Sequence, residues 1–186
     1  MKEYYKINVA GLERDLPLFS VNENLKIAAF IIFGDVELTK ACAHNLLKIA
    51  PEYDIMITAE AKSIPLIYEM ARQAGVNNYI IARKGAKVYM RDVHSVCVNS
   101  ITTHAQQHLY LGEDDAKLLR GRRVLIVDDV ISTGESLHAI EKLVTEAGGN
   151  IVGRVAVLAE GDAAEKFDIK VLGKLPLFDS EGEPIK

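Results

Sequence analysis

Two neighbouring carboxylates, followed by a turn of hydroxyl residues, are the part of this chain best suited to chemistry. Asp128 and Asp129 come directly after the apolar residues 124–127, and the turn beyond them contains Ser132, Thr133, Gly134 and Ser136. Backbone N–H groups at the start of a helix bind anions such as phosphate, and a glycine lets the backbone approach closely. Carboxylates accept hydrogen bonds from sugar hydroxyls, directly or through the water around Mg²⁺. The pattern therefore predicts a site for a ribose 5-phosphate that carries a metal-bound group.

A strand and a helix must hold these residues in place. The apolar residues 124–127 are too few for a helix and predict a strand buried on both faces. Residues 136–147 have the apolar spacing of an amphipathic helix, and Gly148 and Gly149 end it.

The rest of the chain predicts further alternation of strands and helices. Buried strands are predicted at residues 54–58, 79–82, 151–158 and 169–172. Helices are predicted at residues 35–49, with Asp35 as N-cap, and before a stop at Gly75. Residues 88–111 predict a hairpin, or two strands joined by a mobile excursion, and a loop follows at 112–115. Residues 1–33 look irregular apart from a weak edge-strand alternation, and the tail from 173 onward looks weakly structured. The alternation predicts an α/β fold, with a doubly wound, mostly parallel sheet flanked by helices.

Polar loops follow two of the predicted strands. Residues 60–65 follow the strand at 54–58, and three cations follow the strand at 79–82: Arg83, Lys84 and Lys87. A charged loop in solvent explains the cations plainly, but a phosphate site in the same sheet favours a pyrophosphate clamp, because ligands collect at the carboxyl ends of parallel strands. The apolar segment 25–33 also has two explanations. It is either core, which we favour, or a flat pocket in which Phe30 or Phe33 stacks on a base.

Composition limits the class of protein. The chain has 186 residues, 49% of them hydrophobic and 26% charged, which fits one globular domain. Its net charge of −4 gives no basic field that would attract nucleic acid or a membrane. No signal peptide or membrane-spanning run is present. Two cysteines, Cys42 and Cys97, do not make a disulfide framework, and we expect both to be buried apolar residues of a cytoplasmic protein.

Two other phosphate-related classes fit less well. Receiver domains of response regulators also have an apolar strand that ends in two aspartates, but that pair lies near the domain start. Here only 57 residues follow Asp129, and receivers lack the Ser-Thr-Gly turn. A Walker-type loop requires Gly-Lys-Ser/Thr, which is absent.

Residues 124–136 resemble the 5-phosphoribosyl-1-pyrophosphate (PRPP) signature of the type I phosphoribosyltransferases along their whole length. Residues 60–65 look like the pyrophosphate loop of the adenine and xanthine members, and residues 82–84 look like their strand-end Arg-Lys. The resemblance covers about residues 50–160. It implies a single domain over residues 1–186, with a core at about 50–160 and a base-binding hood formed by the chain ends, about 1–34 and 168–186.

The resemblance also implies a role for each matching residue. The 5-phosphate would be held by Ser132, Thr133, Gly134, Glu135 and Ser136, and the ribose hydroxyls by Asp128 and Asp129. Pyrophosphate would be bound by Glu60, Ala61, Lys62, Arg83, Lys84 and Lys87, in relatives across a homodimer interface. Mg²⁺ would ride on the pyrophosphate with no direct side-chain ligand, contacting Asp128 and Asp129 through water. The base would meet Ile27, Phe30 and Leu175.

Two departures from the family pattern affect the expected activity. Adenine-specific relatives place a Glu in the mobile loop, whereas residues 93–111 contain no acid, so His104 is a candidate proton relay or simply an exposed histidine. Ser63 stands where relatives often have Gly. The leading hypothesis is a purine phosphoribosyltransferase of nucleotide salvage. The alternatives are a weakly active paralogue and a PRPP-sensing regulator, although the residues before the core show no Lys/Arg stripe for DNA.

Overall fold

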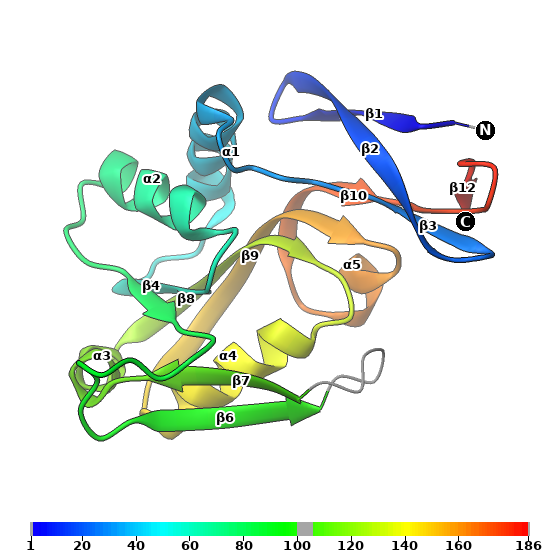
Figure 1. Cartoon of the computed structure of the whole chain (residues 1–186). Coiled ribbons are helices and arrows are strands. Elements are labelled where there is room, and N and C mark those ends of the chain that lie inside the picture. Colours follow the sequence, from blue (N-terminus) through cyan, green and yellow to red (C-terminus); the bar gives the residue numbers. More distant parts are fainter. Residues whose placement is uncertain (1, 100–105, 186) are drawn as a thin grey trace.

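A five-stranded parallel sheet forms the centre of the molecule. The computed structural model describes residues 2–99 and 106–185. The sheet order is β10-β9-β8-β4-β5, and every neighbouring pair is parallel (Figure 1). The strands are β4 (Ile55–Ala59), β5 (Ile80–Ala82), β8 (Arg123–Ile131), β9 (Asn150–Glu160) and β10 (Lys170–Leu175). All five residues of β4 are buried, as expected of a strand covered on both faces.

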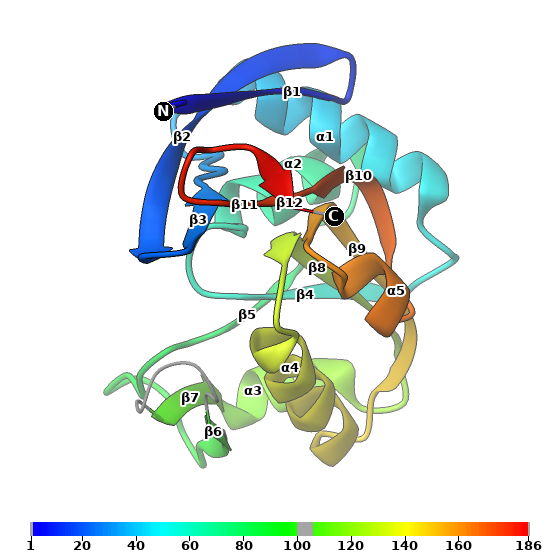
Figure 2. The ribbon, with the colours of Figure 1, turned by 90° about the vertical axis from the view of Figure 1, so that its right-hand side faces the viewer.

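Helices cover both faces of this sheet, so the predicted doubly wound α/β fold is confirmed. Alternate side chains of β8 point to opposite faces. Leu125 and Val127 pack with α1 (Val36–Ile49) and α2 (Ile64–Ala74), whereas Val124 and Ile126 pack with α3 (Glu113–Leu119) and α4 (Glu135–Glu146). Figures 1 and 2 show α1 and α2 on one side of the sheet and α3 and α4 on the other. None of the helices in the described ranges is long and apolar enough to cross a membrane.

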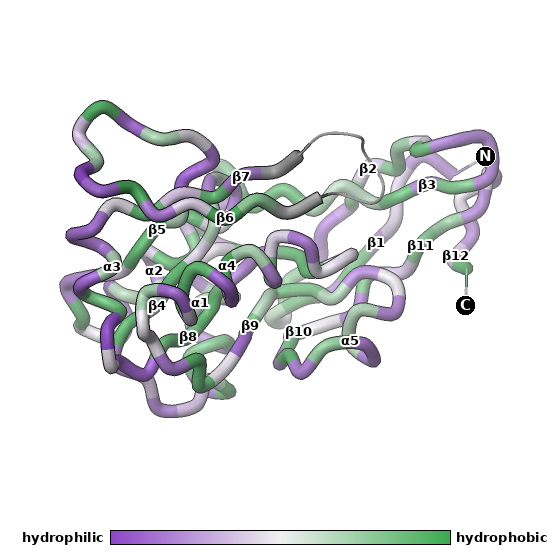
Figure 3. The backbone as a smooth tube through the Cα atoms, turned by 90° about the horizontal axis from the view of Figure 1, so that it is seen from below, coloured by the Kyte–Doolittle hydropathy of each residue, from purple (hydrophilic) through white to green (hydrophobic). Residues whose placement is uncertain are grey.

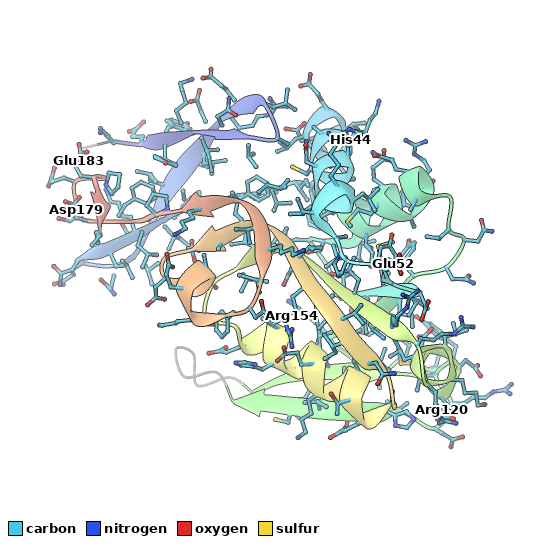
Figure 4. All side chains as sticks on the ribbon, turned by 180° about the vertical axis from the view of Figure 1, so that it is seen from behind. His44, Glu52, Arg120, Arg154, Asp179 and Glu183 are labelled. Atoms are coloured by element: carbon cyan, nitrogen blue, oxygen red, sulfur yellow. The ribbon has the colours of Figure 1, made fainter. Side chains whose placement is uncertain are left out.

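Local signals set the helix ends as predicted. The Asp35 carboxylate accepts the Leu38 N–H at 3.0 Å and caps α1. Gly75 ends α2 with a left-handed φ of 69°. On the back of the molecule, Arg154 of β9 pairs with Glu141 of α4 and ties that helix to the sheet (Figure 4).

The two chain ends form a second, five-stranded sheet, which the sequence did not predict. Its order is β1-β2-β3-β11-β12, with antiparallel pairs of β1 (Tyr4–Val9), β2 (Leu12–Asn22), β3 (Leu25–Ala28), β11 (Leu177–Phe178) and β12 (Pro184–Ile185). Tyr5 and Phe178 bring the ends together, with ring centroids 5.0 Å apart. The expectation of irregular ends is therefore wrong. The sheet lies on the side toward which β9 and β10 point (Figure 1).

Smaller elements adjust three further expectations. Residues 88–111 contain the predicted hairpin, β6 (His94–Asn99) with β7 (Gln106–Leu111). The expected loop at 112–115 is instead the start of α3, where three acidic residues suit the helix N-terminus and Ala116 and Leu119 are buried. A short helix, α5 (Ala163–Lys166), follows β9. Cys42 is buried as expected, but Cys97 is exposed on the hairpin.

Candidate active site

The five residues expected to hold the 5-phosphate line one small pocket at the start of α4. The pocket measures about 40 Å³ and is lined by residues 130–137 together with Asp128. Gly134 is the N-cap of α4, with a φ of 81°. A side chain could not stand there, because a Cβ on Gly134 would lie 2.2 Å from Cζ of Phe167. The loop is therefore closed from behind by an aromatic ring, and its backbone N–H groups lie at a helix N-terminus, where an anion is favoured.

The two carboxylates lie within β8 rather than after it. The strand runs on to Ile131, four residues beyond the predicted end, because β9 continues to pair with it. Asp129 is buried, at 3% exposure, and Asp128 is partly buried. The Ser63 hydroxyl lies between them, 2.7 Å from Asp128 Oδ1 and 3.1 Å from Asp129 Oδ1. Lys62 Nζ stands 3.1 Å from Asp129 Oδ2.

This crowding changes the electrostatics of the pair. Burial, together with the neighbouring Asp129 carboxylate, raises the pKa of Asp128 to about 7, while the hydrogen bond from Ser63 acts in the opposite direction. A pair of carboxylates with one cation beside it suits ligands that donate hydrogen bonds or bring positive charge.

The expected pyrophosphate residues come together, but Glu60 is engaged with the protein itself. Its carboxylate accepts the Lys84 N–H at 2.9 Å and pairs with Arg83 Nη2 at 3.2 Å. The Lys84 N–H and the positive charge of Arg83 lower the pKa of Glu60. The peptide between Glu60 and Ala61 is cis. Glu60 thus joins the two loops, leaving Lys84 exposed and Lys87 half-exposed toward solvent.

Two atoms in these loops have no hydrogen-bond partner in the described part of the chain. They are Arg83 Nε, a donor, and Asp129 Oδ2, which lies near Lys62 without hydrogen-bond geometry. A buried donor beside a buried acceptor oxygen fits a ligand that is both a polyanion and a polyol. Among the described residues no group of three or more His, Cys, Asp or Glu could hold a metal.

The base-binding candidates fare differently. Phe30 and Leu175 are core residues, at 3% and 1% exposure, so their burial leaves no surface for a base and corrects that expectation. Their side chains point inward because both sheets need an apolar inner face. Ile27 keeps partial exposure, and Phe33 is 50% exposed. His104 lies outside the described residues. In addition, Leu175 belongs to β10 of the parallel sheet, so the range expected for the hood contains a strand of the core.

Two contacts of the site were not predicted. Phe167, which packs behind Gly134, follows a four-residue helix and gives no sequence signal. The hydroxyl of Ser63 is the other, although a serine at the start of a helix beside two aspartates is a signal that could have been used.

Comparisons with known proteins agree with this geometry. The family model of the phosphoribosyl transferase domain matches residues 37–178. The hypoxanthine/guanine phosphoribosyltransferase of Methanothermococcus okinawensis is 31% identical over 152 residues, which cover 78% of this chain and 79% of that protein. The adenine phosphoribosyltransferase of Thermotoga maritima is 29% identical over 182 residues, covering 90% and 98%. The structure of the Saccharomyces cerevisiae adenine phosphoribosyltransferase with adenine has a TM-score of 0.68 at 20% identity, covering 85% and 93%. The chain belongs to the phosphoribosyl transferase domain family.

Proposed function

We propose that this protein is a purine phosphoribosyltransferase that transfers ribose 5-phosphate from PRPP to a purine base. The products are the nucleoside monophosphate and pyrophosphate, as in nucleotide salvage. The observation that carries the proposal is the convergence of three groups at one edge of the sheet: the phosphate loop, the carboxylate pair and the cationic loop. The named relatives act on purines, which supports the choice of base.

In the proposed reaction the bond between C1 of the ribose and the pyrophosphate oxygen breaks, and pyrophosphate leaves with the electron pair. A base nitrogen forms the new bond to C1 and loses its proton. The transition state is oxocarbenium-like, so the site must stabilise the leaving group more than it must activate a nucleophile. The loop around Gly134 would hold the 5-phosphate, and Asp128 would accept a hydrogen bond from a ribose hydroxyl. Arg83, Lys84 and Lys87 would balance the charge on pyrophosphate.

Mg²⁺ fits the residues present. The pair Asp128 and Asp129 supplies oxygen atoms, the ligand type that Mg²⁺ prefers, and the cation usually keeps several waters while binding to phosphates. We propose that both carboxylates contact it through water. When bound, the metal would neutralise charge on the departing pyrophosphate.

A product assay tests the function. Purified protein, PRPP and Mg²⁺ are incubated separately with adenine, hypoxanthine, guanine and xanthine, and the nucleotide is followed by chromatography. Turnover with at least one base is expected. PRPP binding without turnover would favour the regulator, which the acid-free sequence of residues 93–111 keeps as the second candidate. Absence of PRPP binding would refute both.

We also propose that the protein is a homodimer and acts in the cytoplasm. The segment 83–93 projects from the molecule (Figure 3) and carries Val88 and Tyr89, at 106% and 67% exposure, beside Lys87. Large apolar side chains displayed in this way are typical of an interface. Both cysteines are free, which suits a reducing compartment. Light scattering during size exclusion tests the dimer: a mass of one chain at assay concentration would refute it, and Tyr89→Ser should weaken association.

A further inference from the structure

Ser63 holds an unusual position between the two carboxylates. Its side chain is buried, at 1% exposure, and its oxygen accepts the N–H of Asp129 at 2.8 Å. The same oxygen lies 2.7 Å from Asp128 Oδ1 and 3.1 Å from Asp129 Oδ1. One hydroxyl therefore contacts the backbone of one aspartate and the side chains of both.

The geometry favours Asp128 as the acceptor of the hydroxyl proton. A serine has a single O–H to donate, so it serves one carboxylate at a time, and the contact to Asp128 is the shorter. The Asp129 N–H also reaches Asp128 Oδ1, at 2.9 Å. Two donors thus hold the same oxygen of Asp128, and no other donor from the described residues is bonded to its second oxygen. That second oxygen is the one left for a ligand.

The hydroxyl is not used for helix capping, although Ser63 is the N-cap of α2. A serine at this position usually accepts a backbone N–H two or three residues further on. Here the side chain makes no such bond and turns to β8 instead. The helix forgoes its side-chain cap, and the contact with the carboxylates takes its place.

We propose that Ser63 is a positioning residue of the ribose site, whose hydroxyl fixes Asp128 so that its second oxygen meets a ribose hydroxyl of PRPP. The inference rests on the proposed function. The similar loop of adenine and xanthine phosphoribosyltransferases often has glycine here, which cannot make this contact. Because Ser63 follows Lys62, which pairs with Asp129, the contact also couples the pyrophosphate loop to the carboxylates.

The test compares PRPP affinity, measured by calorimetry with Mg²⁺, and steady-state kinetics for three variants at this position. Ser63→Ala and Ser63→Gly should weaken PRPP binding by about tenfold, because a hydrogen bond to a charged group is lost. The KM for the base should stay unchanged. Ser63→Thr keeps the hydroxyl and should bind PRPP within about threefold of the native protein. Thr58→Val is the matched control, since it removes a buried hydroxyl from β4 without touching either aspartate.

The outcomes separate the two proposals. If the native protein does not bind PRPP, the proposed function fails. If it binds, but Ser63→Ala and Ser63→Gly bind PRPP equally well, the positioning role alone is overturned. The role is also overturned if Thr58→Val weakens PRPP binding as much, or if Ser63→Thr loses as much as Ser63→Ala. Thermal unfolding of each variant shows that it is folded, and Ser63→Gly carries the test should Ser63→Ala be unstable.

Discussion

Replacing Gly134 with alanine tests the phosphate loop most directly. Gly134 begins α4 with a φ of 81°, a conformation that alanine adopts only with strain. The new methyl group would also lie 2.2 Å from Cζ of Phe167 and 2.8 Å from both Cε atoms, well inside van der Waals contact. Two separate costs therefore act at one position, one in the backbone and one in packing.

Together these costs should lower the free energy of unfolding by about 3 kcal/mol, from the left-handed conformation and overpacking. For a chain of this size the melting temperature should fall by about 6–12 °C. PRPP affinity should fall as well, because relief of the clash moves the first turn of α4. Calorimetric unfolding and a PRPP titration measure the two effects.

Gly121→Ala is the matched control. Gly121 has a similar φ of 70°, but no atom of the described residues lies within 4 Å of the position that its new methyl group would take, so only the backbone cost of about 1 kcal/mol applies. In a Phe167→Leu background, which removes Cζ, Gly134→Ala should also cost less than it does alone. Equal losses for Gly134→Ala and Gly121→Ala would refute the packing argument, and unchanged PRPP affinity would remove Gly134 from the site.

Three further changes probe the charges of the molecule. Asp129→Asn should lower kcat/KM by about a hundredfold, because a charged partner of the sugar site is lost; an unchanged value would mean the site is misassigned. Glu60→Gln should weaken product inhibition by pyrophosphate about fivefold, since the loop at Lys84 loses its charged acceptor; inhibition equal to native would contradict that role. Hydrogen bonds from Arg72 and Gln73 lower the pKa of Glu69 to about 2, so Glu69 stabilises the fold above pH 4.5 and this stability is lost as the pH falls toward 2. Glu69→Gln should flatten urea stability over that window, and an unaltered slope would count against the pairing.

Much of the core could be predicted because its signals are local. The apolar runs of β4 and β8 are buried on both faces, and Asp35 and Gly75 act at the helix ends through their own chemistry. The turn around Gly134 also depends on residues that are adjacent in sequence. Such features require no knowledge of distant partners.

The rest depended on contacts between distant segments. The β1–β3 sheet forms with β11 and β12, more than a hundred residues away, so its pairing leaves little trace in either segment. Phe30 and Leu175 were expected at the surface because an apolar residue near a site can face a ligand or the core, and only packing decides. The predicted end of β8 is too early because Asp128 and Asp129 are poor strand formers, a preference that pairing with β9 overrides.

The charges of the site are already paired with one another in this structure. Lys62 stands against Asp129, and Arg83 against Glu60, so each group that would bind PRPP first neutralises a neighbour. A ligand must therefore exchange internal pairs for its own phosphates, metal and hydroxyls, and only the difference between the two sets appears as affinity. This arrangement keeps the buried Asp129 charge compensated before the substrate arrives. It also explains why Ser63 matters: when Lys62 turns to pyrophosphate, the serine contact is what still holds the carboxylates in place.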